Sequence, residues 1–155
     1  MVRIDIAESG DDLRTAMKLF QDYAASLPVS LGYQDFAGEL ASLPGKYASP
    51  AGALLLARDA DGPLGCVGLR QLEEPGCCEM KRLYLTPAAR GRGIGRLLAT
   101  AVIDRARLLG YRELRLDTLP TMAVAAAMYL DMGFERIDPY YAPTPQGTVF
   151  MRIKL

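Results

Sequence analysis

Residues 90–100 combine three glycines and three arginines with the start of an apolar-periodic segment, which predicts the beginning of a helix. The first turn of a helix has backbone N–H groups without partners and a partial positive charge, so it attracts anions. Glycines let a phosphate approach the backbone closely, and arginines add charge-assisted, often bidentate hydrogen bonds. This segment therefore predicts a binding site for a pyrophosphate group.

The spacing of the glycines excludes two common phosphate-binding motifs. A dinucleotide-binding Gly-x-Gly-x-x-Gly that begins at Gly91 and Gly93 needs a third glycine where this chain has Arg96. A P-loop needs a Gly-Lys-Ser/Thr ending, which is absent.

Arg92 and Arg96 fall in the first helical turns, where a cation opposes the helix dipole and costs roughly a few tenths of a kcal/mol unless an anion is bound. That conflict supports a phosphate ligand.

The pattern Arg90-x-x-Gly93-x-Gly95 resembles the cofactor-binding motif of the GNAT superfamily of acetyl-CoA-dependent N-acetyltransferases. Residues 79–85 resemble the strand that precedes this motif in the family, and residues 125–134 resemble its late helix, which ends in Tyr-x-x-x-Gly-Phe. The order and separation of the three motifs match over residues 50–155 and more loosely over the rest. The resemblance implies an enzyme that transfers an acetyl group from acetyl-CoA to an amine.

The resemblance also implies where the coenzyme binds. In GNAT relatives two parallel strands splay apart, and the pantetheine arm pairs with the backbone of the first strand. The pyrophosphate then lies at the start of the following helix. Carried over to this chain, the cofactor-binding residues are Leu83, Tyr84, Leu85, Arg90, Gly91, Arg92, Gly93, Ile94, Gly95 and Arg96. A main-chain N–H near Leu85 would polarise the thioester carbonyl.

Acetyl transfer needs a base, because an alkyl amine with a pKa of about 10.4 arrives mostly protonated. The chain has no histidine, which excludes Ser-His-Asp and Cys-His catalysis, so a carboxylate is expected to accept the proton directly or through a water. Glu79 is the first candidate, since it lies eleven residues before Arg90, where histone-acetylating relatives carry a glutamate base. The alternative is a structural carboxylate paired with Lys81, Arg82 or Arg112.

Asp117 is the second candidate base. It lies twelve residues before Tyr129, where relatives that acetylate protein N-termini carry a glutamate. The alternative role of Asp117 or Thr118 is to cap the next helix. Tyr129 is the candidate acid, because the resemblance puts it near the cofactor sulfur and a phenol with a pKa of about 10 can donate to a thiolate of about 8.5. Its alternative role is packing of the ring against the sheet.

One position departs from the family pattern. Many relatives have an asparagine seven positions before this tyrosine that bonds to the cofactor or an ordered water, and this chain has Met122 there. A methionine cannot replace those hydrogen bonds. The alternative function is therefore a non-catalytic acyl-CoA-binding or regulatory module on the same fold.

The sequence does not identify the amine that accepts the acetyl group. A protein N-terminus, lysine, a polyamine, an amino acid and an antibiotic all stay open. Its pocket is expected to suit a cationic amine, because the family varies it through the first two helices and the last loop, where this chain has aromatic and acidic residues. These are Tyr33, Tyr47, Tyr140 and Tyr141, with Glu39 and Glu73.

The composition limits the class of protein. The 155 residues suit one domain, 1–155, and 18 basic residues balance 18 acidic ones, which disfavours nucleic acid as a partner. No apolar run approaches the ~20 residues of a membrane span and the start lacks a signal-peptide core, so a cytoplasmic protein without a membrane partner is expected. Cys66, Cys77 and Cys78 fit no metal or disulfide spacing. Monomer and homodimer are both left open.

The hydrophobic pattern predicts alternating strands and helices. Strands are expected at 2–6, 53–58, 64–71, 77–85, 112–118, 134–137 and 148–153, and helices at about 11–26, 34–43, 91–109 and 121–132. Asp11 or Asp12 is expected to cap the first helix. The strand–helix–strand unit 77–118 implies parallel strands with a right-handed crossover, which puts the helix start at the ligand-binding edge of the sheet. The predicted fold class is α+β (mixed α/β), a GNAT-like mixed sheet of six to seven strands with about four helices.

Overall fold

Seven strands form one mixed sheet in the order β1-β2-β3-β4-β5-β7-β6 in the computed structural model, which describes residues 1–155. β4 and β5 run parallel, and every other neighbouring pair is antiparallel. The strands are β1 Arg3–Ile6, β2 Ala53–Asp59, β3 Gly62–Gln71, β4 Cys77–Leu85, β5 Glu113–Thr118, β6 Glu135–Ile137 and β7 Val149–Lys154. The predicted fold class is confirmed.

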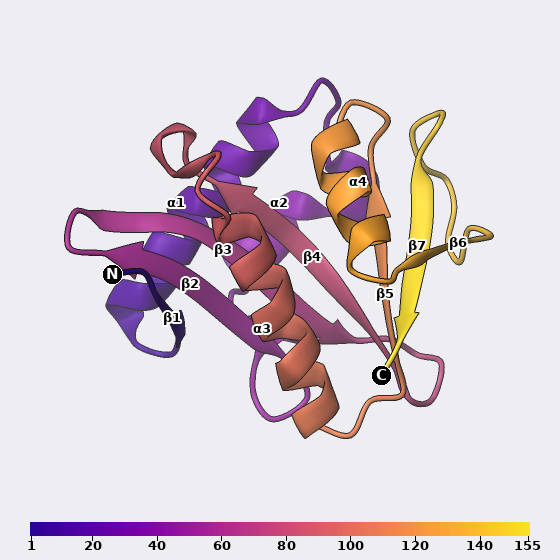
Figure 1. Cartoon of the computed structure of the whole chain (residues 1–155), viewed down its shortest axis with the longest axis horizontal. Coiled ribbons are helices and arrows are strands. Elements are labelled where there is room, and N and C mark those ends of the chain that lie inside the picture. Colours follow the sequence, from indigo (N-terminus) through magenta and orange to yellow (C-terminus); the bar gives the residue numbers. More distant parts are fainter.

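Four α-helices cover the two faces of the sheet. They are α1 Gly10–Ser26, α2 Phe36–Ala41, α3 Ile94–Leu108 and α4 Ala123–Asp131. α3 and α4 lie on one face, and α1 and α2 lie on the other (Figure 1). None of these helices combines the length and the apolar character that crossing a membrane requires.

The first two helices differ in detail from the prediction. Ser9 caps α1, and not Asp11 or Asp12, because the Ser9 hydroxyl accepts a hydrogen bond from the Asp12 N–H. α2 is shorter than expected since Gly32–Gln34 form a separate 3₁₀ turn. Asp35 then takes a left-handed φ of +52°, which interrupts the helix path before α2 begins.

Each face of the sheet has its own apolar core. Under α3, the buried side chains of Leu98 and Val102 pack in one cluster with Leu69 of β3 and Leu114 of β5. Under α1, Phe20 packs edge-on against Tyr47, with ring centroids 5.8 Å apart. The two cores hold α1 and α3 against the central strands, including β4, along which the candidate site lies.

β4 and β5 pair only at their beginnings, through Cys77–Glu79 and Glu113–Arg115. Beyond these residues the two strands diverge (Figure 1). A β-bulge interrupts β4 here: the β3–β4 register shifts by one residue, and Arg82 has a φ of +62°. A bulge bends a strand and increases its twist. The later part of β4 therefore has no strand partner on the side of β5.

Candidate functional site

A groove of about 820 Å³ lies beside the unpaired edge of β4. Its walls come from the end of β4, the starts of α3 and α4, and the last turn of α1 with the residues after it. This volume suits a large ligand, and most of the lining residues are apolar. Of the predicted cofactor-binding residues, five line the groove: Leu83, Tyr84, Leu85, Arg90 and Gly95.

The turn between β4 and α3 fits an anion. Gly91 and Gly93 have left-handed φ values of +77° and +76°, and a Cβ at either position would meet no atom within 4 Å. α3 therefore begins at Ile94 and not at Gly91, with Gly93 as an N-cap that makes no side-chain hydrogen bond. The N–H groups of the first turn remain available to a ligand, as a pyrophosphate site requires. Ile94 can contribute only its backbone, because its side chain is buried in the core.

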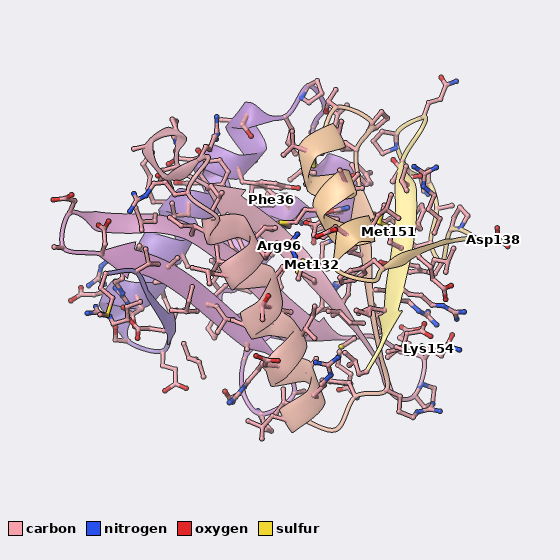
Figure 2. The ribbon with its side chains drawn as sticks, in the orientation of Figure 1. Phe36, Arg96, Met132, Asp138, Met151 and Lys154 are labelled. Atoms are coloured by element: carbon pink, nitrogen blue, oxygen red, sulfur yellow. The ribbon has the colours of Figure 1, made fainter.

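Arg90 and Arg92 in this turn, and Arg96 in the first turn of α3, are exposed on the surface. Arg90 donates one long hydrogen bond, 3.4 Å, to a β4 carbonyl, and Arg92 lies 3.2 Å from Asp59. Arg96 is on the side of α3 that faces α4 and pairs with Asp131 (Figure 2). Exposed ion pairs contribute little to stability, so these guanidinium groups can exchange their partners for a phosphate at small cost.

A narrow pocket between the diverging strands adjoins the groove. Tyr23, Leu83 and Met122 line both of them. Asp117 from β5 and Tyr129 from α4 line the narrow pocket as well, whereas Glu79 does not. The structure thus brings together two of the three predicted catalytic residues, at the inner end of the predicted coenzyme groove.

Asp117 is half-buried near the end of β5. Its Oδ2 accepts a hydrogen bond from the Tyr141 hydroxyl and a long one, 3.4 Å, from Nε2 of Gln34. Neither Asp117 nor Thr118 caps α4, whose N-cap is Met122 without a side-chain hydrogen bond, so the capping alternative is wrong. Because both hydrogen bonds fall on Oδ2, Oδ1 can accept a proton or bind a water.

Glu79 is fully buried and is the last residue of β4 that pairs with β5. Its Oε1 accepts a hydrogen bond of 2.8 Å from Nε of Arg70, and its Oε2 accepts one from the Tyr140 hydroxyl. Lys81 is the only one of its predicted partners nearby, with its Nζ 3.8 Å from Oε1. Both oxygens of Glu79 are therefore engaged with the protein itself.

Tyr129 lies on α4, and its ring packs against that of Phe134 with centroids 5.5 Å apart. Burial raises the pKa of Tyr129 above its ordinary value, and the nearby Tyr23 and Asp117 raise it further. The phenol consequently keeps its proton at neutral pH and offers a hydrogen-bond donor to the narrow pocket. Its predicted packing role and a role as donor are compatible in this geometry.

A second pocket, of about 360 Å³, adjoins the narrow one on the side away from the groove, and we call it the inner pocket. It is lined by Gly32, Tyr33, Gln34, Asp35, Glu39, Arg70, Lys81, Arg82 and Tyr141. Three of the six residues predicted to line the acceptor site line this pocket, namely Tyr33, Glu39 and Tyr141. The other three, Tyr47, Tyr140 and Glu73, do not. Asp117 touches its wall through Tyr141 and Gln34.

Arg82 joins β4 to α2 in the wall of the inner pocket. Its Nε and Nη2 donate to the two oxygens of Glu39 at 2.9 and 3.1 Å, and Nη1 donates to Oε1 of Gln34 at 2.6 Å. The guanidinium also lies over the Phe36 ring, 5.1 Å from its centroid. Arg82 thus pairs with both oxygens of Glu39, which weakens the attraction of this carboxylate for a cationic ligand.

The sequence suggested Lys81 and Arg82 only as partners of Glu79, and not as residues that line a pocket. Alternation along a strand sends consecutive side chains to opposite faces, but the bulge lets Lys81 and Arg82 line the same pocket. The signal was present: two adjacent cations stand in the middle of an otherwise mostly apolar strand, and buried cations require a partner or a function. Arg70 and Gln34 carried no comparable signal.

The cysteines and Met122 take no direct part in acid–base chemistry. Cys66, Cys77 and Cys78 are free and buried, and burial raises the pKa of Cys78 to about 12. A thiol of this kind stays protonated and is a poor nucleophile. Met122 lines both the groove and the narrow pocket, and its sulfur accepts a hydrogen bond of 3.5 Å from Thr118.

Comparisons with known proteins identify the family of the chain and agree with its fold. The Acetyltransferase (GNAT) family model matches residues 16–134. An uncharacterised N-acetyltransferase of Schizosaccharomyces pombe is 38% identical over 155 residues, covering 99% of this chain and 95% of its own. An uncharacterised N-acetyltransferase of Escherichia coli is 28% identical, covering 100% of this chain and 92% of its own. A crystal structure of a GNAT-family acetyltransferase from Staphylococcus aureus superposes with a TM-score of 0.79 at 16% identity, covering 99% of both chains.

Proposed function

The chain belongs to the GNAT family of acetyltransferases, and from this premise we propose that it acetylates a primary amine by direct attack, with Asp117 as base and Tyr129 as acid. The family uses acetyl-CoA, which supplies the thioester whose acetyl group is transferred. The groove beside β4 suits this coenzyme, since it combines an apolar wall, an unpaired strand edge and an uncapped helix start with three exposed arginines. The acceptor amine would enter from the inner pocket.

Asp117 is the better base for three reasons. It lines the same narrow pocket as Tyr129, it is half-buried, and its Oδ1 is free to take a proton. Glu79 instead receives hydrogen bonds on both oxygens and lies outside that pocket. A base must reach the proton that it abstracts, directly or through one water. We assign to Glu79 the role of holding Arg70 and Lys81 in the inner pocket.

The proposed residue roles balance the reaction. Asp117 takes a proton from the ammonium form of the acceptor, so that the amine nitrogen can form a bond to the acetyl carbon. The C–S bond breaks, and Tyr129 donates its hydrogen to the sulfur that leaves. Asp117 passes the first proton to water. The amine nitrogen loses a second proton after the attack, and that proton restores the phenol through Asp117 or water, so the products are an acetamide, the free thiol and one proton. The β4 backbone N–H groups near Leu85 orient the carbonyl oxygen.

The continuity of the groove, the narrow pocket and the inner pocket carries this proposal, because it lets a coenzyme and an amine meet at Asp117 and Tyr129. The test is release of free thiol from acetyl-CoA with a panel of amines, with product identification by mass spectrometry. Amine-dependent thiol release with an acetylated product is expected. Tight coenzyme binding without amine-dependent release would favour the regulatory-module alternative for this chain.

Tyr129→Phe is expected to lower kcat by roughly 10²-fold, at the lower end of the range for acid–base groups, while the Kd for CoA stays near normal. The reason is that the phenylalanine keeps the ring packing but has no hydrogen to donate. Steady-state kinetics together with calorimetry measure the two quantities. Unimpaired turnover would remove the acid role.

The pH profile gives an independent check of Tyr129. Because burial raises its pKa above the ordinary 10.0, the acid form persists through neutral and moderately alkaline pH and is lost only above that value. The acceptor amine becomes easier to deprotonate over the same range. We expect kcat to rise with pH and then level off, without a descending limb at or below pH 10.0. A fall in kcat near pH 8, with the protein still folded, would contradict this assignment.

A further inference from the structure

The inner pocket contains a buried cation that makes no hydrogen bond to the protein. The Lys81 side chain is only 4% exposed, and its nearest carboxylate oxygen, Oε1 of Glu79, is 3.8 Å away, beyond hydrogen-bond distance. The nearest aromatic ring, that of Tyr141, has its centroid 5.9 Å from Nζ. Burial disfavours the charged form and lowers the pKa of Lys81, although Glu79 and Asp117 oppose that shift, so an anionic ligand that accepts hydrogen bonds from Nζ would stabilise the ammonium.

Arg70 adds further unused donors to the same pocket. Its Nε is bonded to Glu79, while a guanidinium has two Nη nitrogens that can each donate two more hydrogens. Arg70 lines the inner pocket beside Lys81. Together these two side chains offer several N–H donors and no acceptor to a ligand.

The carboxylates around the pocket already face donors of the protein itself. Both oxygens of Glu39 accept from Arg82, and Glu79, which is outside the lining of the inner pocket, accepts from Arg70 and Tyr140. Asp35 lies at the exposed rim. The groups of the inner pocket that still lack hydrogen-bond partners are therefore the N–H donors of Lys81 and Arg70.

We propose that the acceptor carries a carboxylate beside its amine, and that Lys81 and Arg70 bind this carboxylate in the inner pocket. The inference rests on the proposed function and names its substrate class: a small amino carboxylic acid. Lys81 lines the narrow pocket as well as the inner one, so a carboxylate bound to it leaves the amine of a short molecule facing Asp117. A pocket of about 360 Å³ matches a ligand of that size. A polyamine would instead bring further positive charge against Arg70, Lys81 and Arg82, so this proposal departs from the expectation of a cationic acceptor.

The test compares the common L-amino acids with their own carboxamides in the thiol-release assay, with spermidine and an amidated peptide as further acceptors. The carboxamide keeps the amine and the side chain but replaces the carboxylate with a neutral group. Since a carboxamide also lowers the pKa of the neighbouring amine, it is intrinsically the easier nucleophile at neutral pH. A preference for the acid therefore reports recognition of the carboxylate and not reactivity. Preferred use of spermidine, of the peptide or of carboxamides would overturn the inference while leaving the proposed function in place.

Lys81→Met tests the residue itself, because it keeps the apolar stem and removes the ammonium. The KM of the best amino acid is expected to rise about tenfold to a hundredfold, the range for hydrogen bonds to charged groups, with the carboxamide kinetics unchanged. Lys81→Arg should recover part of the loss. Lys154→Met, which removes an exposed cation from β7, is the matched control and should leave both substrates unaffected. An unchanged ratio of acid to carboxamide in Lys81→Met would refute the assignment.

Direct binding separates this inference from failure of the proposed chemistry. Calorimetry of the CoA-loaded protein with the amino acid and with its carboxamide needs no turnover. Binding of the acid alone, lost in Lys81→Met, supports the carboxylate site even if no acetyl transfer is detected. Equal binding of both, or of neither, overturns it.

Discussion

Asp117→Asn is expected to lower kcat by about 10²- to 10⁴-fold, the contribution typical of a general base, while the Kd for CoA remains unchanged. The asparagine side chain is nearly isosteric and its oxygen can still accept the Tyr141 hydrogen bond, so the pocket keeps its shape. What is lost is the capacity to take a proton. Steady-state kinetics and calorimetry with CoA measure the two effects separately.

The pH dependence of this variant distinguishes a base from a structural residue. At high pH the acceptor amine is already deprotonated and needs no base. The ratio of wild-type to Asp117→Asn activity should therefore shrink as pH rises toward the pKa of the amine. A ratio that stays constant across the pH range would indicate that Asp117 only positions its neighbours.

Glu79→Gln is the matched variant for the other candidate carboxylate. It removes a buried negative charge and leaves Arg70 and Lys81 facing a neutral amide, so we expect a loss of stability on the order of 3 kcal/mol. Thermal and denaturant unfolding measure that loss. If Glu79→Gln were as stable as the wild type and lost as much turnover as Asp117→Asn, the base would be Glu79 and the proposed assignment would be reversed.

Gly93→Asp is expected to weaken CoA binding by more than about a hundredfold without unfolding the protein, because a carboxylate at the helix start repels the pyrophosphate. The folded structure can accept the side chain: a Cβ at Gly93 meets no atom within 4 Å, and aspartate is among the residues that tolerate a left-handed φ. Calorimetry with CoA and thermal unfolding make the comparison.

Gly110→Asp provides the control for this substitution. Gly110 follows the other end of α3, about 22 Å away along a helix of 15 residues. It has a φ of +88°, and a Cβ there would also meet no atom within 4 Å. Both variants carry a comparable backbone strain and the same added charge. Only Gly93→Asp should lose CoA binding, and equal losses in both would refute the pyrophosphate site.

Local structure was predictable wherever local chemistry decides it. β4 is confirmed at both ends, because its apolar run is bounded by Gly76 with a left-handed φ and by Pro87 after the strand. The start of α3 was predicted three residues too early, since Gly91 and Gly93 continue the turn before the helix begins. The cap of α1 was also misplaced, because Ser9 and the aspartates after it carry the same kind of signal.

The parallel pairing of β4 with β5 and the predicted place of the pyrophosphate site followed from the sequence by itself. Residues 77–118 contain a strand, a glycine-rich turn, a helix and a strand, and a parallel crossover leaves the turn at the edge of the sheet where ligands bind. Such features depend on neighbours along the chain. Tyr129 became the candidate acid in the same way, from its place in the short motif that ends its helix.

Only the tertiary structure decided which carboxylate shares a pocket with Tyr129 and which cations line the inner pocket. Glu79 and Asp117 are both acidic residues on adjacent strands. Glu79 lies where β4 and β5 are still paired and is buried in ion pairs, whereas Asp117 lies beyond the end of that pairing and lines a pocket. Lys81 and Arg82 share a pocket because one bulge overrides strand alternation. These outcomes depend on register and on contacts between residues far apart in the chain, such as Arg82 with Glu39, which periodicity does not encode.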